Sequence, residues 1–317
     1  MSFIASCTAA AIKDAATSLI NGDLVAFPTE TVYGLGADAG NEIAIKKIYQ
    51  VKGRPFDHPL IVHISNLQYL DRWAREIPEY AIKLARSFWP GPMTLILPRT
   101  QLAKDFITGG QDNVGIRIPD QPLALALLSQ FEQQGGMGVA APSANRFGKV
   151  SPTTAKAVEA ELGAFLDSKD LILDGGSCEV GVESTIIDCT TQTPIILRPG
   201  AITIAMITDA TGLDVGSENI LKTKASGLLE SHYSPSAKVI LDQTPQAGDG
   251  FIALSDIKTP AGVIRLASPK NNIEYAKQIY KALRDADEQQ LKIVHAQLPT
   301  GDDIAVAIRD RLKKSAN

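Results

Sequence analysis

The turn Lys52-Gly53-Arg54-Pro55 places two cations on either side of a glycine, directly after a helical pattern and before an apolar strand pattern. Arg and Lys side chains bind phosphate and carboxylate groups, and a glycine between them lets the backbone come close to such a group. This turn is therefore predicted to bind an anion.

Other polar residues occupy comparable places in the first 200 residues, each after an apolar strand or helix pattern. Arg198 follows the strand expected over Ile195 to Leu197, and the segment 142–154 follows the strand expected over Gly138 to Ala141. Four cations are candidate anion ligands, namely Lys52, Arg54, Arg117 and Arg198. The neutral hydrogen-bonding groups are Thr31, Ser143, Asn145, Ser151 and Ser184. This set fits a nucleoside triphosphate together with a small carboxylate.

Each of these segments also has an ordinary structural interpretation. The segment 28–36 is expected to be a loop, either a ligand loop or a glycine-containing turn with a threonine helix cap. The segment 142–154 is either a second phosphate cradle or a capped loop before a helix. Arg117 alternates with Val114 and Ile116 in a strand pattern, so it faces either a ligand or solvent.

Well-known nucleotide and hydrolase motifs are missing from the sequence. It contains no G-x-x-x-x-G-K-[ST] P-loop and no G-x-G-x-x-G after the first strand. It also lacks a G-x-S-x-G elbow and an H-E-x-x-H pair, so no motif supports hydrolase or metalloprotease chemistry.

The composition is that of a globular protein of about two domains. The 317 residues are 44% hydrophobic and 21% charged, and the formal net charge of -4 leaves no general polybasic surface for nucleic acid. The three cysteines are far apart and form no C-x-x-C pair, which fits a reducing compartment. No signal peptide and no apolar run of membrane-spanning length is visible, so a cytoplasmic location without membrane contact is expected.

The chain is expected to divide into a catalytic domain over 1–208, a linker over 209–236 and a small α/β domain over 237–317. The linker is rich in Gly, Ser, Thr and Lys and has little periodicity. Beyond it, apolar strands alternate with helical stripes, which indicates an α/β layer domain. The expected strands are Val239 to Leu241, Phe251 to Leu254, Val263 to Leu266 and Leu291 to Val294, and the helical stripes run from Ile273 to Leu283 and from Ile304 to Leu312.

Ordered motifs along the chain resemble the YrdC-like threonylcarbamoyl-AMP synthases. The motifs are PTETVYGL at 28–35, KGRPFDHPL at 52–60, PSAN at 142–145 with SPT at 151–153, ESTI at 183–186, LRPG at 197–200 and HYSP at 232–235. HYSP followed by a small α/β domain is similar to the longer, two-domain form. The resemblance implies a twisted, open mixed sheet with flanking helices, plus a smaller C-terminal α/β domain.

The resemblance also implies a reaction. These enzymes condense L-threonine, bicarbonate and ATP to threonylcarbamoyl-AMP with release of pyrophosphate, for N6-threonylcarbamoyladenosine at position 37 of tRNAs that read codons beginning with A. Such a chain would be a nucleotidyltransferase that uses ATP with Mg²⁺, although no carboxylate cluster identifies metal ligands. A tRNA or a tRNA-modification complex would receive the intermediate.

Residue roles follow from the same motifs. The implied catalytic cluster is Lys52, Arg54, Ser143 and Asn145. The implied ATP contacts are Arg54, His58, Asn113, Ser143, Ser151, Arg198 and Tyr233. The implied L-threonine contacts are Thr31, His63, Arg117, the Ala141 backbone and Ser184, with Arg117 as the partner of the substrate carboxylate.

Two alternatives compete with this interpretation. The same fold is associated with RNA binding without catalysis, but the acidic chain lacks the interleaved aromatic and basic residues of an RNA module. A related domain also occurs in a carbamoyl-transfer protein of hydrogenase maturation, whose Cys-rich segments have no counterpart among the three scattered cysteines.

Overall fold

The larger part of the chain folds around a ten-stranded mixed sheet in the strand order β1-β8-β2-β3-β7-β4-β6-β5-β9-β10. The computed structural model describes residues 3–216, 225, 227 and 232–317. The strands are β1 Ile4–Ala5, β2 Val25–Phe27, β3 Gly34–Asp38, β4 Ile61–His63, β5 Met93–Pro98, β6 Asn113–Arg117, β7 Val139–Ala140, β8 Leu171–Leu173, β9 Thr185–Asp188 and β10 Ile195–Arg198. Parallel and antiparallel neighbours alternate irregularly, which confirms the expected open mixed sheet.

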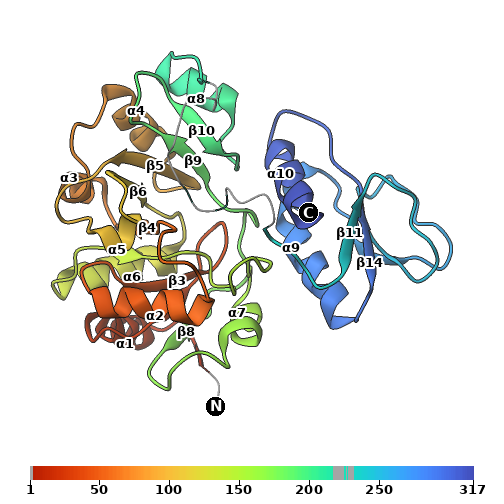
Figure 1. Ribbon diagram of the computed structural model, residues 1–317, viewed down its shortest axis with the longest axis horizontal. Coiled ribbons are helices and arrows are strands. Elements are labelled where there is room, and N and C mark those ends of the chain that lie inside the picture. The colour runs from red at the N-terminus through yellow and green to blue at the C-terminus, as the bar shows by residue number, and fades with distance from the viewer. Residues whose placement is uncertain (1–2, 217–224, 226, 228–231) are drawn as a thin grey trace.

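Helices flank this sheet, as expected (Figure 1). They are α1 Ala9–Ile20, α2 Glu42–Lys52, α3 Leu70–Trp73 after a short 3-10 turn at Leu67–Tyr69, α4 Glu79–Phe88, α5 Asp105–Thr108, α6 Pro122–Gln133, α7 Ala155–Leu162 and α8 Ile204–Thr211. Helix α2 ends at Gly53, whose φ of 62° is left-handed and suits glycine at a helix end. The turn after α2 therefore lies where the sequence predicts it.

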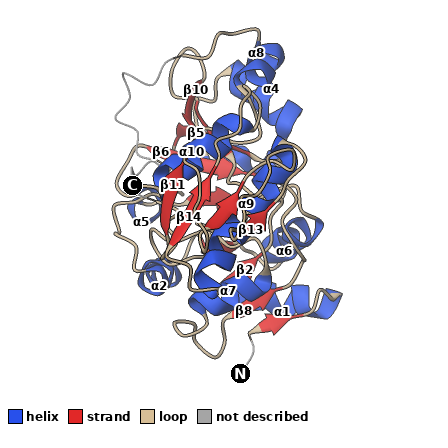
Figure 2. Cartoon of the chain, turned by 90° about the vertical axis from the view of Figure 1, so that its right-hand side faces the viewer, coloured by secondary structure: helices blue, strands red, loops and turns tan. Residues whose placement is uncertain are grey.

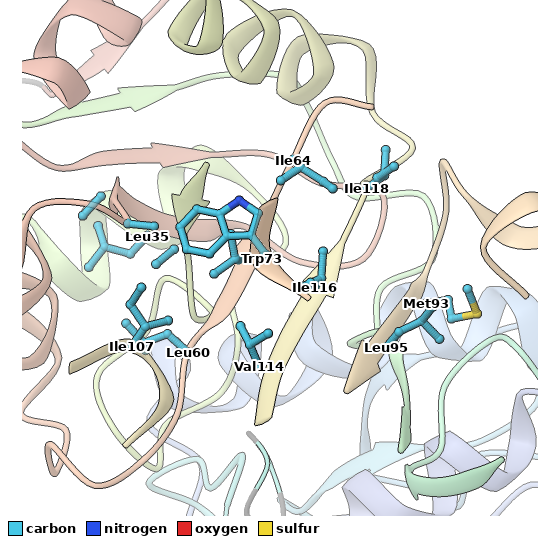
Figure 3. Packing of buried hydrophobic residues seen from close by; sticks show 14 of the residues in the cluster. Leu35, Leu60, Ile64, Trp73, Met93, Leu95, Ile107, Val114, Ile116 and Ile118 are labelled. Atoms are coloured by element: carbon cyan, nitrogen blue, oxygen red, sulfur yellow. The ribbon is translucent and has the colours of Figure 1, made fainter. Parts of the chain in front are cut away.

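One face of the sheet carries the main hydrophobic core. Alternate strand residues such as Val114, Ile116 and Leu95 point into it, and Trp73 packs among them (Figure 3). On the opposite face, α1 and α6 cover only the end formed by β2, β7 and β8. The remainder of that second face carries the apolar residues Ile61, Ile96 and Ile186 together with polar strand residues.

The expectation of a loop over 28–36 is partly wrong, because β3 begins at Gly34. Glycine is rare in strands, which is why the pattern indicated a turn. In the structure a Cβ on Gly36 would lie 2.8 Å from Val139 Cγ1 and 2.9 Å from Phe27 Cε1. The glycine is needed for close packing between neighbouring elements rather than for a turn.

The C-terminal part has a four-stranded, all-parallel sheet in the order β11-β14-β12-β13. Its elements are β11 Lys238–Leu241, β12 Gly250–Ile252, β13 Ile264–Ala267, α9 Asn272–Glu288, β14 Ile293–Ala296 and α10 Ala305–Ser315. Helices α9 and α10 lie between this sheet and the large domain (Figures 1 and 2). The expected small α/β domain is thus confirmed.

The segment predicted as a linker, 209–236, overlaps the end of α8, which continues to Thr211. Residues 217–224, 226 and 228–231 of that segment lie outside the described residues. Within the described part of the chain, no helix combines the length and apolar character needed to cross a membrane.

Candidate active site

Strand alternation gathers polar side chains on the second face of the large sheet. In β4 and β6, Val62 and Ile116 point into the main core, so His63 and Arg117 point the other way. These two residues are direct partners in the parallel β4–β6 ladder. Each is also the last residue of its strand, as is Arg198 in β10. The candidate site therefore lies at the carboxyl ends of several strands on one face of the sheet.

A cavity on this face is lined by most of the residues predicted to bind ligands. The predicted residues on its wall are Thr31, Lys52, Arg54, His63, Arg117, Ala141, Ser143, Asn145, Ser184, Arg198 and Tyr233. His58, Asn113 and Ser151 are not on this wall. His58 packs edge-on against the lining residue Phe147, and Ser151 hydrogen-bonds the lining residue Glu183 at 2.6 Å. Asn113 lines a neighbouring apolar groove that shares Ile61 with the cavity.

Lys52 ties the end of α2 to the loop that carries Ser143 and Asn145. Its Nζ donates to Ser143 O at 2.6 Å and to Asn145 O. Burial and the nearby Arg54 lower the pKa of Lys52 well below its usual value. A bound anion would favour the charged form of this amine. Asn145 Nδ2 donates to Arg146 O and Lys149 O, whereas its buried Oδ1 has no hydrogen-bond partner and is left for a ligand.

Two further guanidinium groups line the cavity. Arg54 Nη2 donates to Pro59 O at 2.9 Å, and burial lowers the pKa of Arg54 to about 10. Arg198 Nε donates to Ser184 O at 3.0 Å, and its Nη2 donates to Ser184 Oγ at 3.1 Å. Both side chains remain cationic at neutral pH and concentrate positive charge in a buried site. Such a site favours a polyanion.

Arg117 is buried rather than solvated, and it is paired with a carboxylate. Its Nη2 donates to Glu30 Oε1 at 2.6 Å, and both side chains are almost fully buried. Glu30 Oε2 accepts from Asp120 N at 3.0 Å, and Arg117 Nε donates to Gly91 O at 3.3 Å. Glu30 therefore fixes the orientation of the guanidinium that lines the cavity.

Small polar groups line the same cavity as Arg117. Thr31 Oγ1 lies 2.8 Å from Thr29 Oγ1, and Ser184 Oγ lies 2.8 Å from Thr94 Oγ1. The Ala141 N–H is already used, because it donates to Ile61 O at 2.9 Å. Only the carbonyl of Ala141 remains for a ligand. A cation with hydroxyl neighbours suits a small hydroxy amino acid.

Residues just before the C-terminal domain close the cavity from above. His232 and Tyr233 line it and are 7% and 1% exposed. The Tyr233 OH and the His232 Nδ1 are both buried without a hydrogen-bond partner. Tyr233 also has a left-handed backbone with φ of 61°, an uncommon state for a bulky residue. These orphaned polar atoms point to a ligand that completes the site.

Two histidines of the site are held neutral. Burial lowers the pKa of His63 to about 3, with a further contribution from Arg117, and burial lowers the pKa of His232 to about 3 despite Glu183. Both values lie below the usual 6.5, so the unfolded chain binds protons below pH 6.5 that the folded chain does not. Folding stability is therefore lost as the pH falls from about 6.5 toward 3.

We expect these two histidines to lower the unfolding free energy by roughly 2 kcal/mol between pH 6.5 and 5.5, about 1 kcal/mol per histidine. Glu183 does not contribute in this interval, since its lowered pKa acts only below the usual 4.5. Urea titrations at both pH values measure the change. The variant His63→Gln should lose about half of it, and an identical change in variant and wild type would contradict the assignment.

Several site residues were not predicted from the sequence. Glu30, Glu183 and His232 lie inside the motifs quoted above, but no role was assigned to them. Each of the three is a charged or titratable residue within a segment that was already predicted to bind a ligand, and this feature could have identified them. Phe147 and Gly227 also line the cavity, and Arg311 of α10 contacts Glu183 at 2.9 Å. Nothing in the spacing of the C-terminal residues indicated that last contact.

The site can bind and orient anionic groups, but it offers little for metal ligation. Glu183 is the carboxylate on the cavity wall, and it is engaged by Ser151, Tyr280 and Arg311. Among residues 3–216, 225, 227 and 232–317, no group of three or more His, Cys, Asp or Glu side chains could hold a metal ion.

Comparisons with known proteins cover the whole chain. Residues 17–200 match the Sua5/YciO/YrdC family model, which is described as telomere recombination. Residues 202–317 match the model described as threonylcarbamoyl-AMP synthase, C-terminal domain. Threonylcarbamoyl-AMP synthase of Pyrococcus abyssi is 39% identical over an alignment 325 positions long, which covers 96% of this chain and 94% of that protein. The Bacillus subtilis protein of the same name is 39% identical over an alignment 327 positions long, which covers 96% of this chain and 92% of the relative.

Comparison with solved structures indicates the same family. The Pyrococcus abyssi Sua5 protein complexed with L-threonine is 36% identical and has a TM-score of 0.89, with 99% of this chain and 98% of that chain covered. Full-length HypF is only 18% identical with a TM-score of 0.52, covering 61% of this chain and 30% of HypF, and shares the fold alone. The chain belongs to the Sua5/YciO/YrdC family, in the two-domain form that carries the threonylcarbamoyl-AMP synthase C-terminal domain.

Proposed function

We propose that this chain makes L-threonylcarbamoyl-AMP from L-threonine, bicarbonate and ATP and releases pyrophosphate. The observation that carries the proposal is one cavity whose wall holds four basic side chains, Lys52, Arg54, Arg117 and Arg198, beside the hydroxyl groups of Thr31 and Ser184. Such a cavity suits a hydroxy amino acid and a triphosphate held at the same time. The relatives that match nearly the full length carry the name of this activity.

The reaction requires two anions to meet. The amine of threonine adds to carbon dioxide derived from bicarbonate and loses a proton, which gives a carbamate. A carbamate oxygen then attacks the α-phosphorus of ATP, and the bond to the pyrophosphate oxygen breaks. Fixed cations reduce the repulsion between carbamate and triphosphate and stabilise charge on the transferring group. This is nucleotidyl transfer, with bicarbonate as co-substrate and Mg²⁺ supplied with ATP.

The site residues are assigned roles by their position. Arg117, oriented by Glu30, would bind the threonine carboxylate, and Thr31, His63, Ser184 and the Ala141 carbonyl would contact the rest of that substrate. His63 is neutral, so it adds no charge there. The triphosphate would lie against Arg54 and Arg198, with Lys52, Ser143 and Asn145 shaping the loop beside it. The remaining predicted ATP contacts are His58, Asn113, Ser151 and Tyr233.

The product would serve the formation of N6-threonylcarbamoyladenosine in tRNA. We propose that a tRNA-modification complex receives it and that the reaction takes place in the cytoplasm, where three free cysteines would stay reduced. RNA binding without catalysis and carbamoyl transfer of the hydrogenase-maturation kind are not favoured. Neither explains full-length similarity to proteins named threonylcarbamoyl-AMP synthase.

Pyrophosphate release tests the proposed reaction. The purified chain is incubated with ATP, L-threonine and bicarbonate, and each substrate is omitted in turn. Release should require all three, and L-serine, which lacks the methyl group, should replace threonine poorly. Release that continues at full rate without threonine would overturn the proposed function.

A further inference from the structure

The helices of the C-terminal domain pack directly on loops that border the cavity. Val32, Val150 and Val182 of the large domain share a buried apolar cluster with Ile279 and Leu283 of α9. Each of the three valines directly neighbours a residue of the candidate site in the sequence. A shift of α9 would therefore be transmitted to three walls of the cavity.

The fit between α9 and the large domain is tight enough to require a glycine. Gly181 has a left-handed φ of 83°, and a Cβ at this position would lie 2.4 Å from Ala276 O and 2.5 Å from Lys277 Cα. Close backbone contact of this kind fixes the position of the following residues. Those residues lead directly to Glu183.

Glu183 joins the two domains through its carboxylate. Ser151 Oγ donates to Oε1 at 2.6 Å, whereas Tyr280 OH and Arg311 Nε donate to Oε2 at 2.8 and 2.9 Å. Arg311 is fully buried and Glu183 is 5% exposed. Burial alone would raise the pKa of Glu183, but Arg311 and Arg198 outweigh it and lower this pKa to about 2. Glu183 is therefore an anion on the wall of a site built for anions.

The charge of Arg311 affects the interaction between Arg198 and the Glu183 carboxylate. Arg198 and Arg311 both stabilise the Glu183 carboxylate electrostatically. In the structure Arg311 takes the direct contact with Glu183, while Arg198 donates to Ser184 O and Ser184 Oγ. Without Arg311, Glu183 would attract Arg198 and would repel a triphosphate.

Helix α10 also holds the residues Gly227 and Tyr233, which line the cavity. Ser315 Oγ lies 3.0 Å from the acceptor Tyr233 O, and Lys314 Nζ donates to Gly227 O at 2.8 Å. The Arg311 guanidinium lies 5.3 Å from the centroid of the Tyr233 ring, and the Tyr280 ring stacks on the Tyr233 ring with the two centroids 5.6 Å apart. Both the wall residue Glu183 and the covering residue Tyr233 are thus held by α9 and α10.

We propose that Arg311 and Tyr280 of the C-terminal domain are positioning residues for the nucleotide. They neutralise and orient Glu183 and hold Tyr233 over the cavity. The C-terminal domain completes the site of the large domain, and its removal would leave Glu183 with Ser151 alone of these three donors. This inference rests on the proposed function only in taking the nucleotide to be ATP.

Affinity for ATP, measured by calorimetry on the full-length chain without threonine, tests the proposal. We expect Arg311→Met to weaken ATP binding by about 30-fold, because it leaves a buried charge unpaired. Tyr280→Phe keeps the ring and loses one hydrogen bond, and should weaken binding by about fivefold. Arg309→Met is the matched control, since Arg309 lies on the same helix and donates to Pro299 O within its own domain.

A second substitution separates positioning from a general loss of structure. If Arg311→Met weakens ATP binding because the Glu183 charge is left unpaired, adding Glu183→Gln should restore most of the lost ATP affinity. Equal ATP affinity in Arg311→Met and wild type, or no recovery in the double variant, would overturn the proposal. If Arg311→Met does not fold, wild-type ATP affinity in a folded Tyr280→Phe chain would overturn it as well. Pyrophosphate release without threonine would contradict the proposed function and leave this inference untouched.

Discussion

Replacing Arg117 with alanine is expected to raise the KM for L-threonine by about 100-fold or more. Truncating one partner of a buried, hydrogen-bonded charge pair costs about 2–5 kcal/mol, and the substrate carboxylate also loses its cationic partner. ATP affinity should change far less, because Arg54 and Arg198 remain. Arg117→Lys should be nearly as harmful, since an ammonium group cannot bind Glu30 and a carboxylate with the fork of a guanidinium.

Folding and substrate binding can be separated in this experiment. Arg117→Ala leaves the Glu30 carboxylate buried and unpaired, whereas Arg117→Met combined with Glu30→Gln removes both charges. The double variant should regain stability without regaining affinity for threonine. Arg86→Ala, which alters an exposed arginine of α4, is the control. Threonine saturation that is unchanged in Arg117→Ala would remove Arg117 from the site.

Replacing Lys52 with methionine should lower kcat/KM by about 100-fold while the chain still folds. Methionine keeps most of the buried stem but cannot donate to Ser143 O and Asn145 O. The loop with Ser143 and Asn145 would then shift, and a displacement of about 1 Å in a reacting arrangement costs about 100-fold. The two carbonyls left without a donor should cost about 1–3 kcal/mol of unfolding free energy each.

The matched control for this variant is Lys47→Met on the same helix. Lys47 Nζ donates to Gly22 O, away from the cavity, so this change should affect stability only slightly and kcat/KM not at all. Steady-state pyrophosphate release and urea unfolding are measured on both variants. A loss of activity in Lys52→Met that is fully explained by its unfolded fraction would assign this lysine a purely structural role.

The alternation of side chains along a strand allowed much of the candidate site to be predicted from the sequence. Apolar residues at Val114 and Ile116 place Arg117 on the opposite face of β6, and the helix stop at Gly53 places Lys52 beside a turn. These inferences depend on periods of two and 3.6 residues, which are local properties. The general location of the cations was therefore predictable.

Pairings between distant segments could not be predicted in this way. Glu30 meets Arg117 across 87 residues, and Glu183 meets Arg311 across 128 residues. Such contacts depend on strand order and domain packing, about which local periodicity carries no information. The strand β3 was missed for a related reason, because close packing against Val139 and Phe27 overrides the low strand preference of glycine.

Mass spectrometry of the reaction product tests the central claim most directly. The full-length chain is supplied with ATP, ¹³C-labelled bicarbonate and ¹⁵N-labelled L-threonine, and nucleotides are analysed at early times. The account predicts an AMP adduct that carries one ¹³C and one ¹⁵N, formed in equal amount with pyrophosphate by the wild type and strongly reduced in Arg117→Ala. An adduct that lacks the ¹³C label, or pyrophosphate release without any threonine-containing adduct, would contradict it.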